Sequence, residues 1–512
     1  MLKKTHYLFD NAKFRNHLID KILDGTIQID QNICDCIYKV EKKKGVLVLS
    51  TTRVNGDGTQ KCNYQQTLNN MGHSMEFLGQ GSYGLASKIC LDPLCNLSYA
   101  IKVIMYNNNQ LFGQLDNPIR PENIELTVFQ KLNKEILLTK VSPHIILYIQ
   151  HFRCDGVPAL WSSGTQIEFD EYSSQLLENF YHTDHALILV SELAQYGSLN
   201  SYLKNQSITF DEHILSILFF QFIYTFAQIQ KTFPGFRHND SHGGNILVQK
   251  DENYEPTKQK YYIYHYNNTF YKIPVIDPQI KIWDFDFSNI IGHTENQDGQ
   301  GNLKAKIFNP NEFGYRHTKN HYYDLHIFVN DLLMKIYGAY QGYDSMLAIP
   351  KMSPLIQLFH EIIPFEYAGI NTQNTGFGRL KHDIEITTPE RVLFGPYIKN
   401  KFSVLIDSID LNEVVDVYGI DLMELKNLLQ SSKSSIIPKI QLKKKQHIDQ
   451  NSSICQIPKI KKVYPTGYCL QQKHHPCPQK SRWCSYCFQN IEQCNNQKFP
   501  RIKGNYSFKR PK

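Results

Sequence analysis

The sequence has no hydrophobic run long enough to cross a membrane. Its most apolar stretch, residues 214–227 (ILSILFFQFIYTFA), is interrupted by Ser216 and Gln221, whereas a membrane helix needs about 20 predominantly apolar residues. We therefore predict a buried helix here and no membrane partner. The first residues, MLKKTHYLFDNAKFRNH, also lack the apolar core of a secretory signal, so we expect an intracellular protein.

The sequence shows neither internal repeats nor the cysteine pattern of a secreted disulfide scaffold. No similarity recurs with a period of roughly 20–50 residues, which argues against a solenoid or a propeller. Six of the 12 cysteines lie between Cys455 and Cys494. Because a reducing compartment is expected, we interpret the cysteines as thiols and not as disulfides.

Charge is divided unequally along the 512 residues. The net charge is +7, but residues 431–512 contain 17 Lys or Arg against 2 Asp or Glu, so residues 1–430 are net acidic. Composition and charge together predict four parts. They are an N-terminal extension (1–70), a main folded domain (71–402), a linker (403–450) and a basic tail rich in Cys and His (451–512).

Two stretches in the N-terminal half are suited to holding phosphate. The first, GQGSYG at 79–84, follows the strand-like MEFL, and glycines let a backbone bend tightly and approach phosphate oxygens with its N–H groups. Alone, it equally fits a glycine-rich hairpin without a ligand. The second, YAIKVI, contains Lys102, which we expect to face inward toward an anion because an unpaired buried ammonium is costly. A solvated edge lysine is the alternative.

A predicted helix, PENIELTVFQKL at 121–132, contains two candidate carboxylate partners for this lysine. We select Glu125 over Glu122 because it shares a helix face with Val128 and Phe129 and should point into the interior. A surface position for either carboxylate is the alternative.

Two further stretches contain carboxylates at positions suited to phosphoryl transfer. In FRHNDSHGGNILV, Asp240 precedes Asn245 by five residues, which places a carboxylate near an acceptor hydroxyl and an amide near a metal. In IKIWDFDFSNI, Asp284 follows a strand-like segment, where a loop carboxylate suits Mg²⁺. A turn or helix-cap aspartate is the alternative for Asp284.

In this order, the stretches resemble the protein-kinase superfamily and, more narrowly, the serine/threonine protein kinases of nucleocytoplasmic large DNA viruses. The narrower resemblance covers about residues 71–402 and rests on PENIELTVFQKL, SPHIIL, LVSELAQYGSL, FRHNDSHGGNILV, WDFDF, NHYYDLHIF and GRLKHDIEITTPERVL. It implies an α+β, bilobal protein-kinase-like fold, with a small β-rich N-terminal lobe and a larger helical C-terminal lobe, followed by the basic tail. It also implies a virus-encoded enzyme of the host cytoplasm or the virion that uses ATP and Mg²⁺ to phosphorylate hydroxyls of a protein substrate.

The resemblance assigns roles at the nucleotide. Lys102 would bind the α- and β-phosphates and pair with Glu125, and Ser191 would occupy the gatekeeper position. Backbone groups of Glu192 and Ala194 would face adenine. The residues expected around the nucleotide are Gly79, Gln80, Gly81, Ser82, Tyr83, Gly84, Ala86, Ala100, Lys102, Glu125, Glu192 and Ala194.

The resemblance also assigns roles at the transfer centre. Asp240 would accept the proton of the substrate hydroxyl, and Asn245 and Asp284 would hold Mg²⁺. Asp324, in YYDLH, would brace the catalytic loop from a helix.

Several features depart from the kinase pattern. Asn239 stands where an arginine is usual, so we expect activity without activation-loop phosphorylation. His242 replaces a lysine and resembles the loop of aminoglycoside- and choline-type kinases, which leaves a small-molecule acceptor open. Asp286 replaces the glycine of DFG, which argues against a switching loop. Residues 250–279 predict an inserted polar hairpin, and no APE sequence defines the substrate platform.

The tail contains candidate zinc ligands. Cys484 and Cys487 form a C-x₂-C pair whose spacing suits one edge of a tetrahedral Zn²⁺ site. Cys469 with Cys477, or a histidine with Cys477, would supply the other edge. A disordered tail with free thiols is the alternative.

The basic charge of the tail also predicts a partner. It would attract nucleic acid or an acidic protein, and Trp483, Tyr486 and Phe488 could stack on bases. A solvated basic tail is the alternative. For the whole chain, a serine/threonine protein kinase is the leading interpretation. The alternatives are a small-molecule kinase, or an inactive kinase-like scaffold with a nucleic-acid-binding tail.

Overall fold

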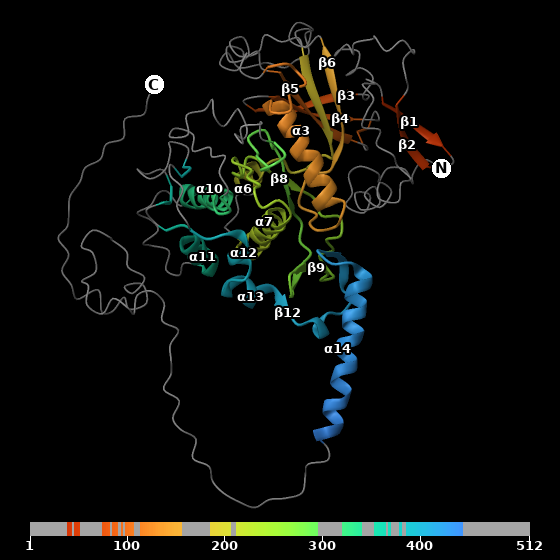
Figure 1. Cartoon of the computed structure of the whole chain (residues 1–512), viewed down its shortest axis with the longest axis vertical. Helices are drawn as coiled ribbons and strands as arrows, with labels where there is room; N and C mark the ends of the chain where they lie inside the picture. Colours follow the sequence, from red (N-terminus) through yellow and green to blue (C-terminus); the bar gives the residue numbers. More distant parts are fainter. Residues whose placement is uncertain are drawn as a thin grey trace, which may run out of the picture. The chain divides into compact units, whose positions relative to one another are not determined.

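Figure 1 shows the computed structural model of the chain, which divides into two units, residues 1–440 and 441–512. The residues that the structure describes are 38–43, 46–51, 74–81, 84–90, 94–95, 98–106, 113–155, 185–205, 211–294, 320–339, 353–364, 367–369, 378–380 and 386–443. The tail cysteines Cys469, Cys477, Cys484 and Cys487 lie outside these ranges. No finding supports zinc, and the zinc and nucleic-acid interpretations of the tail stay predictions.

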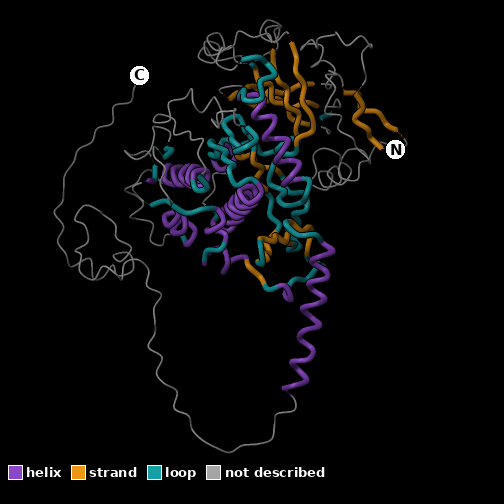
Figure 2. The backbone as a smooth tube through the Cα atoms, in the orientation of Figure 1, coloured by secondary structure: helices purple, strands orange, loops and turns teal. Residues whose placement is uncertain are grey.

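A five-stranded antiparallel sheet forms the sheet-rich region of the first unit (Figure 2). Its order is β3-β4-β5-β7-β6. The central strands are rich in Ile, Val and Leu, residues that pack well on a pleated surface. The strands are β3 (Ser74–Gly81), β4 (Gly84–Cys90), β5 (Ser98–Met105), β6 (Tyr148–Asp155) and β7 (His185–Ser191).

Helix α3 (Pro121–Leu132) packs against this sheet and continues into a π-helical turn, Asn133–Leu137. The helix has proline at its first position, where the missing N–H costs nothing. Phe129 packs edge-on to Tyr148 of β6, with the ring centroids 5.4 Å apart. This contact fixes the face of α3 that carries Glu125.

Helix α7 (Glu212–Thr232) is the buried helix that the sequence predicts. Asp211 caps it by accepting hydrogen bonds from the His213 and Ile214 backbone nitrogens. It is the one described helix that is long and apolar enough to cross a membrane, but 83% of its most apolar window is buried inside the fold. A helix that is apolar all round packs inside a protein core, and Phe222 stacks on Phe328 with 3.8 Å between ring centroids.

The other helices surround α7 in the helical region. Helix α10 supplies Phe328, and helices α11, α12 and α13 follow it in the sequence. The structure thus confirms mixed helix and strand content. The bounds are α6 (Leu199–Asn205), α10 (Tyr323–Ala339), α11 (Pro354–Ile362), α12 (Pro389–Leu393) and α13 (Pro396–Phe402).

The predicted hairpin within residues 250–279 is confirmed, but it is not polar. Strands β9 (Tyr261–Tyr266) and β10 (Thr269–Pro274) pair between β8 (Ile246–Gln249) and β11 (Gln279–Ile282). The hairpin turns its tyrosines inward, and Tyr264 is fully buried against Phe220 of α7.

The predicted linker over 403–450 is wrong for its first part. Strand β12 (Ser403–Val404) pairs with β10, and β13 (Val414–Tyr418) pairs in parallel with β9. A short 3₁₀ turn, Ile406–Ser408, lies between them, and helix α14 (Leu422–Lys443) follows. Apolar side chains of this segment close a small core over the hairpin. That core consists of Ile263, Phe270, Ile409, Val417, Leu425 and Leu429.

Two smaller features concern the N-terminal half. Strand β2 (Val46–Thr51) pairs with β1 (Tyr38–Lys43). Cys90 and Cys95 form a disulfide, which corrects the expectation that all cysteines are thiols. The end of β4 and the following turn bring their Cα atoms to 4.7 Å, within disulfide reach.

Candidate functional site

Lys102 of strand β5 lies within a cluster of carboxylates. Its Nζ lies 2.7 Å from Glu125 Oε1 of α3 and 2.6 Å from Asp284 Oδ1, which follows β11. The choice of Glu125 over Glu122 is therefore confirmed, because Glu122 instead contacts Arg120 at 3.3 Å. Three segments far apart in the sequence meet at this ammonium.

The carboxylates of the cluster keep the buried Lys102 charged. Burial alone would lower the pKa of Lys102, but the Asp284 and Glu125 carboxylates outweigh it and the pKa is raised, so the lysine stays charged. Burial raises the pKa of Glu125, and the Lys102 ammonium opposes this. Asp286 adds a third carboxylate whose charge acts on Lys102. One ammonium therefore lies among three carboxyl groups, of which Asp284 and Asp286 lie on one segment.

The glycine stretch and two alanines keep the sheet face beside Lys102 free of bulky side chains. A Cβ on Gly84 would lie 2.6 Å from the Val103 carbonyl oxygen, so β4 can approach β5 this closely only with glycine. Ala86 pairs with Lys102 across β4 and β5, and Ala100 lies two residues before Lys102 on the same face. Both alanines are half-buried.

The remaining glycine-stretch residues are only partly described. A β-bulge in β3 lies just before Gly79, and a Cβ there would meet no atom within 4 Å. Gln80 and Gly81 belong to β3, without described side chains. Ser82 and Tyr83 lie outside the described residues. Their expected contact with phosphates stays a prediction.

The segment after β7 is held from inside the protein by Glu192. Its carboxylate accepts hydrogen bonds from the Leu147 backbone nitrogen (2.7 Å) and from Gln249 Nε2 (3.0 Å). Its own backbone N–H donates to the Leu147 carbonyl (3.0 Å), so an adenine would meet the Glu192 carbonyl, which Ser191 Oγ contacts at 3.1 Å. Ala194 follows, half-buried. The adenine contacts of Glu192 and Ala194 stay predictions.

Asp324 holds the loop that precedes Asp240. Its two carboxylate oxygens accept hydrogen bonds from the His238 and Asn239 backbone nitrogens, each at 2.8 Å. Asp324 is fully buried on α10, and burial raises its pKa. Asn239 has a left-handed backbone conformation (φ 65°), which is strained for a residue other than glycine. The hydrogen bond from its N–H to Asp324 helps to hold this conformation. The predicted bracing by Asp324 is therefore observed.

The loop itself brings the transfer residues together. Asn245 Nδ2 donates to the Asp240 carbonyl at 2.9 Å, which leaves its Oδ1 as an oxygen ligand. The Trp283 backbone N–H donates to the Asn245 carbonyl at 3.2 Å, which places Asp284 next to this loop. Asn239 is fully buried, and its Nδ2 donates to the Phe287 carbonyl at 2.9 Å.

This donor set fits Mg²⁺ held jointly with phosphate. Asn245 Oδ1 and the Asp284 carboxylate are hard oxygen ligands, and Mg²⁺ commonly takes one or two carboxylates plus substrate phosphates and water. Within the described ranges, no group of three or more His, Cys, Asp or Glu side chains could hold a metal by itself. A bound phosphate would thus have to complete the coordination.

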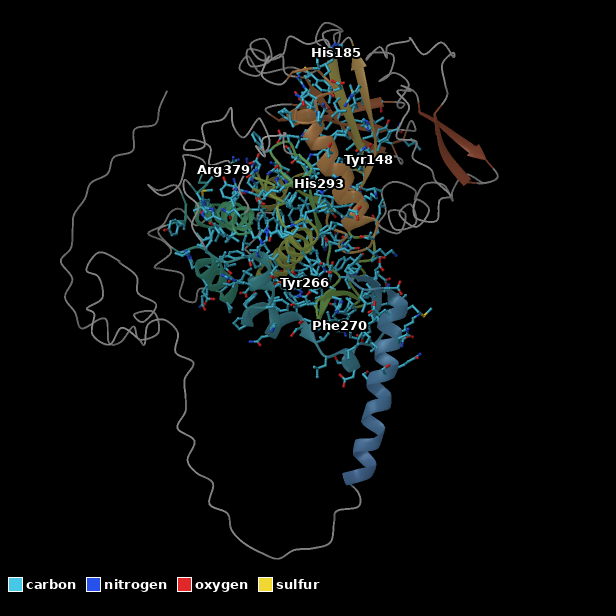
Figure 3. All side chains as sticks on the ribbon, viewed as in Figure 1. Tyr148, His185, Tyr266, Phe270, His293 and Arg379 are labelled. Carbon is cyan, nitrogen blue, oxygen red and sulfur yellow. A yellow bond between two sulfur atoms is a disulfide. The ribbon has the colours of Figure 1, made fainter. Side chains whose placement is uncertain are left out.

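Arg379 is the site residue that sequence reasoning missed. Figure 3 labels Arg379. Its guanidinium forms an ion pair with Asp240 Oδ1, although 139 positions separate the two residues. The stretch GRLKHD contributed to the kinase resemblance without a role for its arginine. A local signal was Gly378, which precedes it with a left-handed φ of +72°.

A cavity of about 370 Å³ lies elsewhere, beside the hairpin. Two lysines line it, but Lys272 is already paired with Glu413 at 2.7 Å. None of its lining residues belongs to the cluster around Lys102 and Asp240, and we assign it no role.

Comparison with known proteins shows what the chain is similar to. No family model matches the chain. Two proteins of Acanthamoeba polyphaga mimivirus, each named as a serine/threonine-protein kinase, are similar to it. The first is 29% identical over 339 residues, which cover 65% of this chain and 70% of the relative. The second is 25% identical over 322 residues, which cover 56% of this chain and 77% of the relative.

A shorter match extends beyond viruses. A protein of Dictyostelium discoideum named as a serine/threonine-protein kinase is 35% identical over 109 residues, 20% of this chain and 8% of that protein. The predicted resemblance is confirmed. The chain resembles serine/threonine-protein kinases of a giant DNA virus.

Proposed function

We propose that this protein is a virus-encoded, intracellular serine/threonine protein kinase with a bilobal kinase fold, which uses ATP and Mg²⁺. The observation that carries the proposal is the Lys102–Glu125–Asp284 cluster beside the Asp240 loop, which Asp324 braces. The kinase names of similar proteins support a protein acceptor.

The residues would divide the reaction among them. Lys102 would hold the α- and β-phosphates, while Asn245 Oδ1 and the Asp284 carboxylate would hold Mg²⁺. Bound Mg²⁺ would neutralise phosphate charge and orient the phosphates. Asp240 would accept the proton of a substrate serine or threonine hydroxyl while the oxygen of that hydroxyl bonds to the γ-phosphorus. The bond from that phosphorus to the β–γ bridging oxygen would break, and ADP would leave.

A comparison of acceptors tests this proposal. The full chain is incubated with γ-³²P-labelled ATP and Mg²⁺, separately with casein, with a basic protein, and with a panel of aminoglycosides and choline. We expect label on protein, recovered as phosphoserine or phosphothreonine. Label only on a small molecule would instead establish the alternative that His242 leaves open. No label on any acceptor would contradict kinase activity.

A further inference from the structure

The catalytic carboxylate proposed above has two partners on the same oxygen. Asp240 Oδ1 forms the ion pair with Arg379 and lies 3.4 Å from His242 Nε2. Among the described residues, no hydrogen bond reaches Asp240 Oδ2. The carboxylate is therefore held through one oxygen, and the other is the one that a hydroxyl could approach.

Of these two partners, His242 is held by a contact within the catalytic loop. Its Nδ1 accepts a hydrogen bond from the Gly244 backbone N–H at 2.9 Å. This contact fixes the ring with its Nε2 on the side of Asp240, 3.4 Å from Oδ1.

Arg379 supplies a positive charge to the buried carboxylate of Asp240. Both side chains are largely buried, with 9% and 13% of their surfaces exposed. A carboxylate this deep is costly unless it is paired, and a guanidinium keeps its charge at every relevant pH. A charge-assisted hydrogen bond of this kind is shorter and stronger than a neutral one.

The backbone around Arg379 is fixed to the helix that braces the catalytic loop. Asn330 of α10 donates from Nδ2 to the Gly378 carbonyl at 2.7 Å and accepts from the Gly369 backbone N–H at 2.6 Å. Leu380 is buried against Tyr323 and Ile327 of the same helix. One helix therefore positions the loop backbone through Asp324 and the arginine through Asn330.

We infer that Arg379 is a positioning residue for phosphoryl transfer, resting on the kinase function proposed above. It fixes Asp240 through Oδ1, in the rotamer that presents Oδ2 to the acceptor hydroxyl, and its guanidinium gives the buried carboxylate a permanent countercharge. The hydrogen bonds of Asn330 on α10 hold the backbone beside Arg379, and they do not involve Asp240. The position of the arginine therefore does not depend on the ion pair alone.

Kinetics of three substitutions test this inference. Arg379→Met removes the charge, Arg379→Gln keeps a polar group of similar reach, and Arg379→Lys keeps the charge but loses the planar fork. We expect Arg379→Met to lower kcat by about 10- to 100-fold, because a misplaced catalytic group costs that much. KM for ATP should stay within about twofold of wild type, since Lys102 and not Asp240 meets the nucleotide.

Two further readouts exclude a purely structural role. Arg379→Lys should retain more activity than Arg379→Gln, and guanidinium at a sub-denaturing concentration should restore activity to Arg379→Met. Arg391→Met on α12, away from Asp240, is the matched control, with wild-type kcat expected. If Arg379→Met fails to fold, the activities of Arg379→Lys and Arg379→Gln test the inference, and equal activities would overturn it.

The outcomes separate the inference from the proposed function. An inactive Asp240→Asn beside an Arg379→Met variant with wild-type kcat would overturn the inference and leave the kinase function intact. A raised kcat in Arg379→Met would also overturn it, because the arginine would then obstruct the base. Phosphate transfer that is equal in wild type and Asp240→Asn would refute the function itself.

Discussion

Asp324→Asn tests how the catalytic loop is held. The carboxylate receives two backbone N–H groups, from His238 and Asn239, each at 2.8 Å, in a fully buried position. An asparagine keeps one acceptor oxygen and turns an NH₂ group toward the other N–H. One charge-assisted hydrogen bond is lost, and a buried backbone donor is left without an acceptor.

The cost follows from these two changes. Leaving a buried donor unsatisfied costs about 1–3 kcal/mol, and more where the lost partner was charged, so we expect a loss of about 3 kcal/mol in unfolding free energy. For a domain of this size, 1 kcal/mol corresponds to about 2 °C in Tm, which gives a decrease of about 6 °C. If the loop opens locally, the same energy would speed hydrogen exchange of the two amides by about 100-fold.

Calorimetry and hydrogen exchange at the amides of residues 238 and 239 measure the effect without reference to activity. The matched control is Asp211→Asn. Asp211 also accepts two backbone N–H groups, but at the exposed N-terminus of α7, where asparagine caps as well as aspartate. Its Tm should stay within about 1 °C of wild type. An Asp324→Asn variant with the Tm and amide exchange of wild type would show that Asp324 does not hold the loop.

Three other predictions concern pH, phosphorylation and chain length. Burial lowers the pKa of His326 to about 4, and its Nε2 contacts the Tyr367 carbonyl at 2.8 Å. The unfolded chain therefore binds the extra proton below pH 6.5, and stability present above that pH is lost toward pH 4, by about 3 kcal/mol. His326→Gln should flatten this slope in urea titrations, and an unchanged slope would contradict the assignment. Phosphatase treatment should leave kcat unchanged, because Asn239 stands where kinases usually have the phosphate-binding arginine, and its side chain donates to the Phe287 carbonyl instead. Loss of activity on treatment would refute this. Truncation after Phe402 should lower Tm relative to truncation after Lys443, because it uncovers the apolar hairpin face. Equal Tm values would mean that the segment is a linker after all.

Local patterns predicted the parts of the site that depend on short stretches. Helical periodicity identified Glu125 as the inward carboxylate, and strand alternation placed Lys102 inside. The pairing of the two needed only the expectation that a buried ammonium requires an anion. A hairpin within residues 250–279 was also predicted, although as a polar one.

Distant pairings were not predictable in the same way. Arg379 meets Asp240 across 139 positions, and nothing in the sequence near either residue states the distance between them in the fold. Residues 403–450 were interpreted as a linker because a Ser- and Lys-rich stretch begins near residue 431. The residues before it nevertheless include buried apolar side chains such as Ile409, Val417 and Leu425. Those residues are buried only because β12 and β13 pair with strands of the inserted hairpin. Composition cannot report a partner that lies elsewhere in the chain.

The central claim is that Asp240 serves a phosphoryl transfer from ATP to a protein hydroxyl. Its most direct test is single-turnover transfer from γ-³²P-labelled ATP with Mg²⁺, measured for wild type and Asp240→Asn at equal Tm and equal ATP affinity. We predict phosphoserine or phosphothreonine with wild type and a rate lower by at least about 100-fold with the variant. Equal rates for the two proteins, or no transfer by wild type to any protein, would contradict the account.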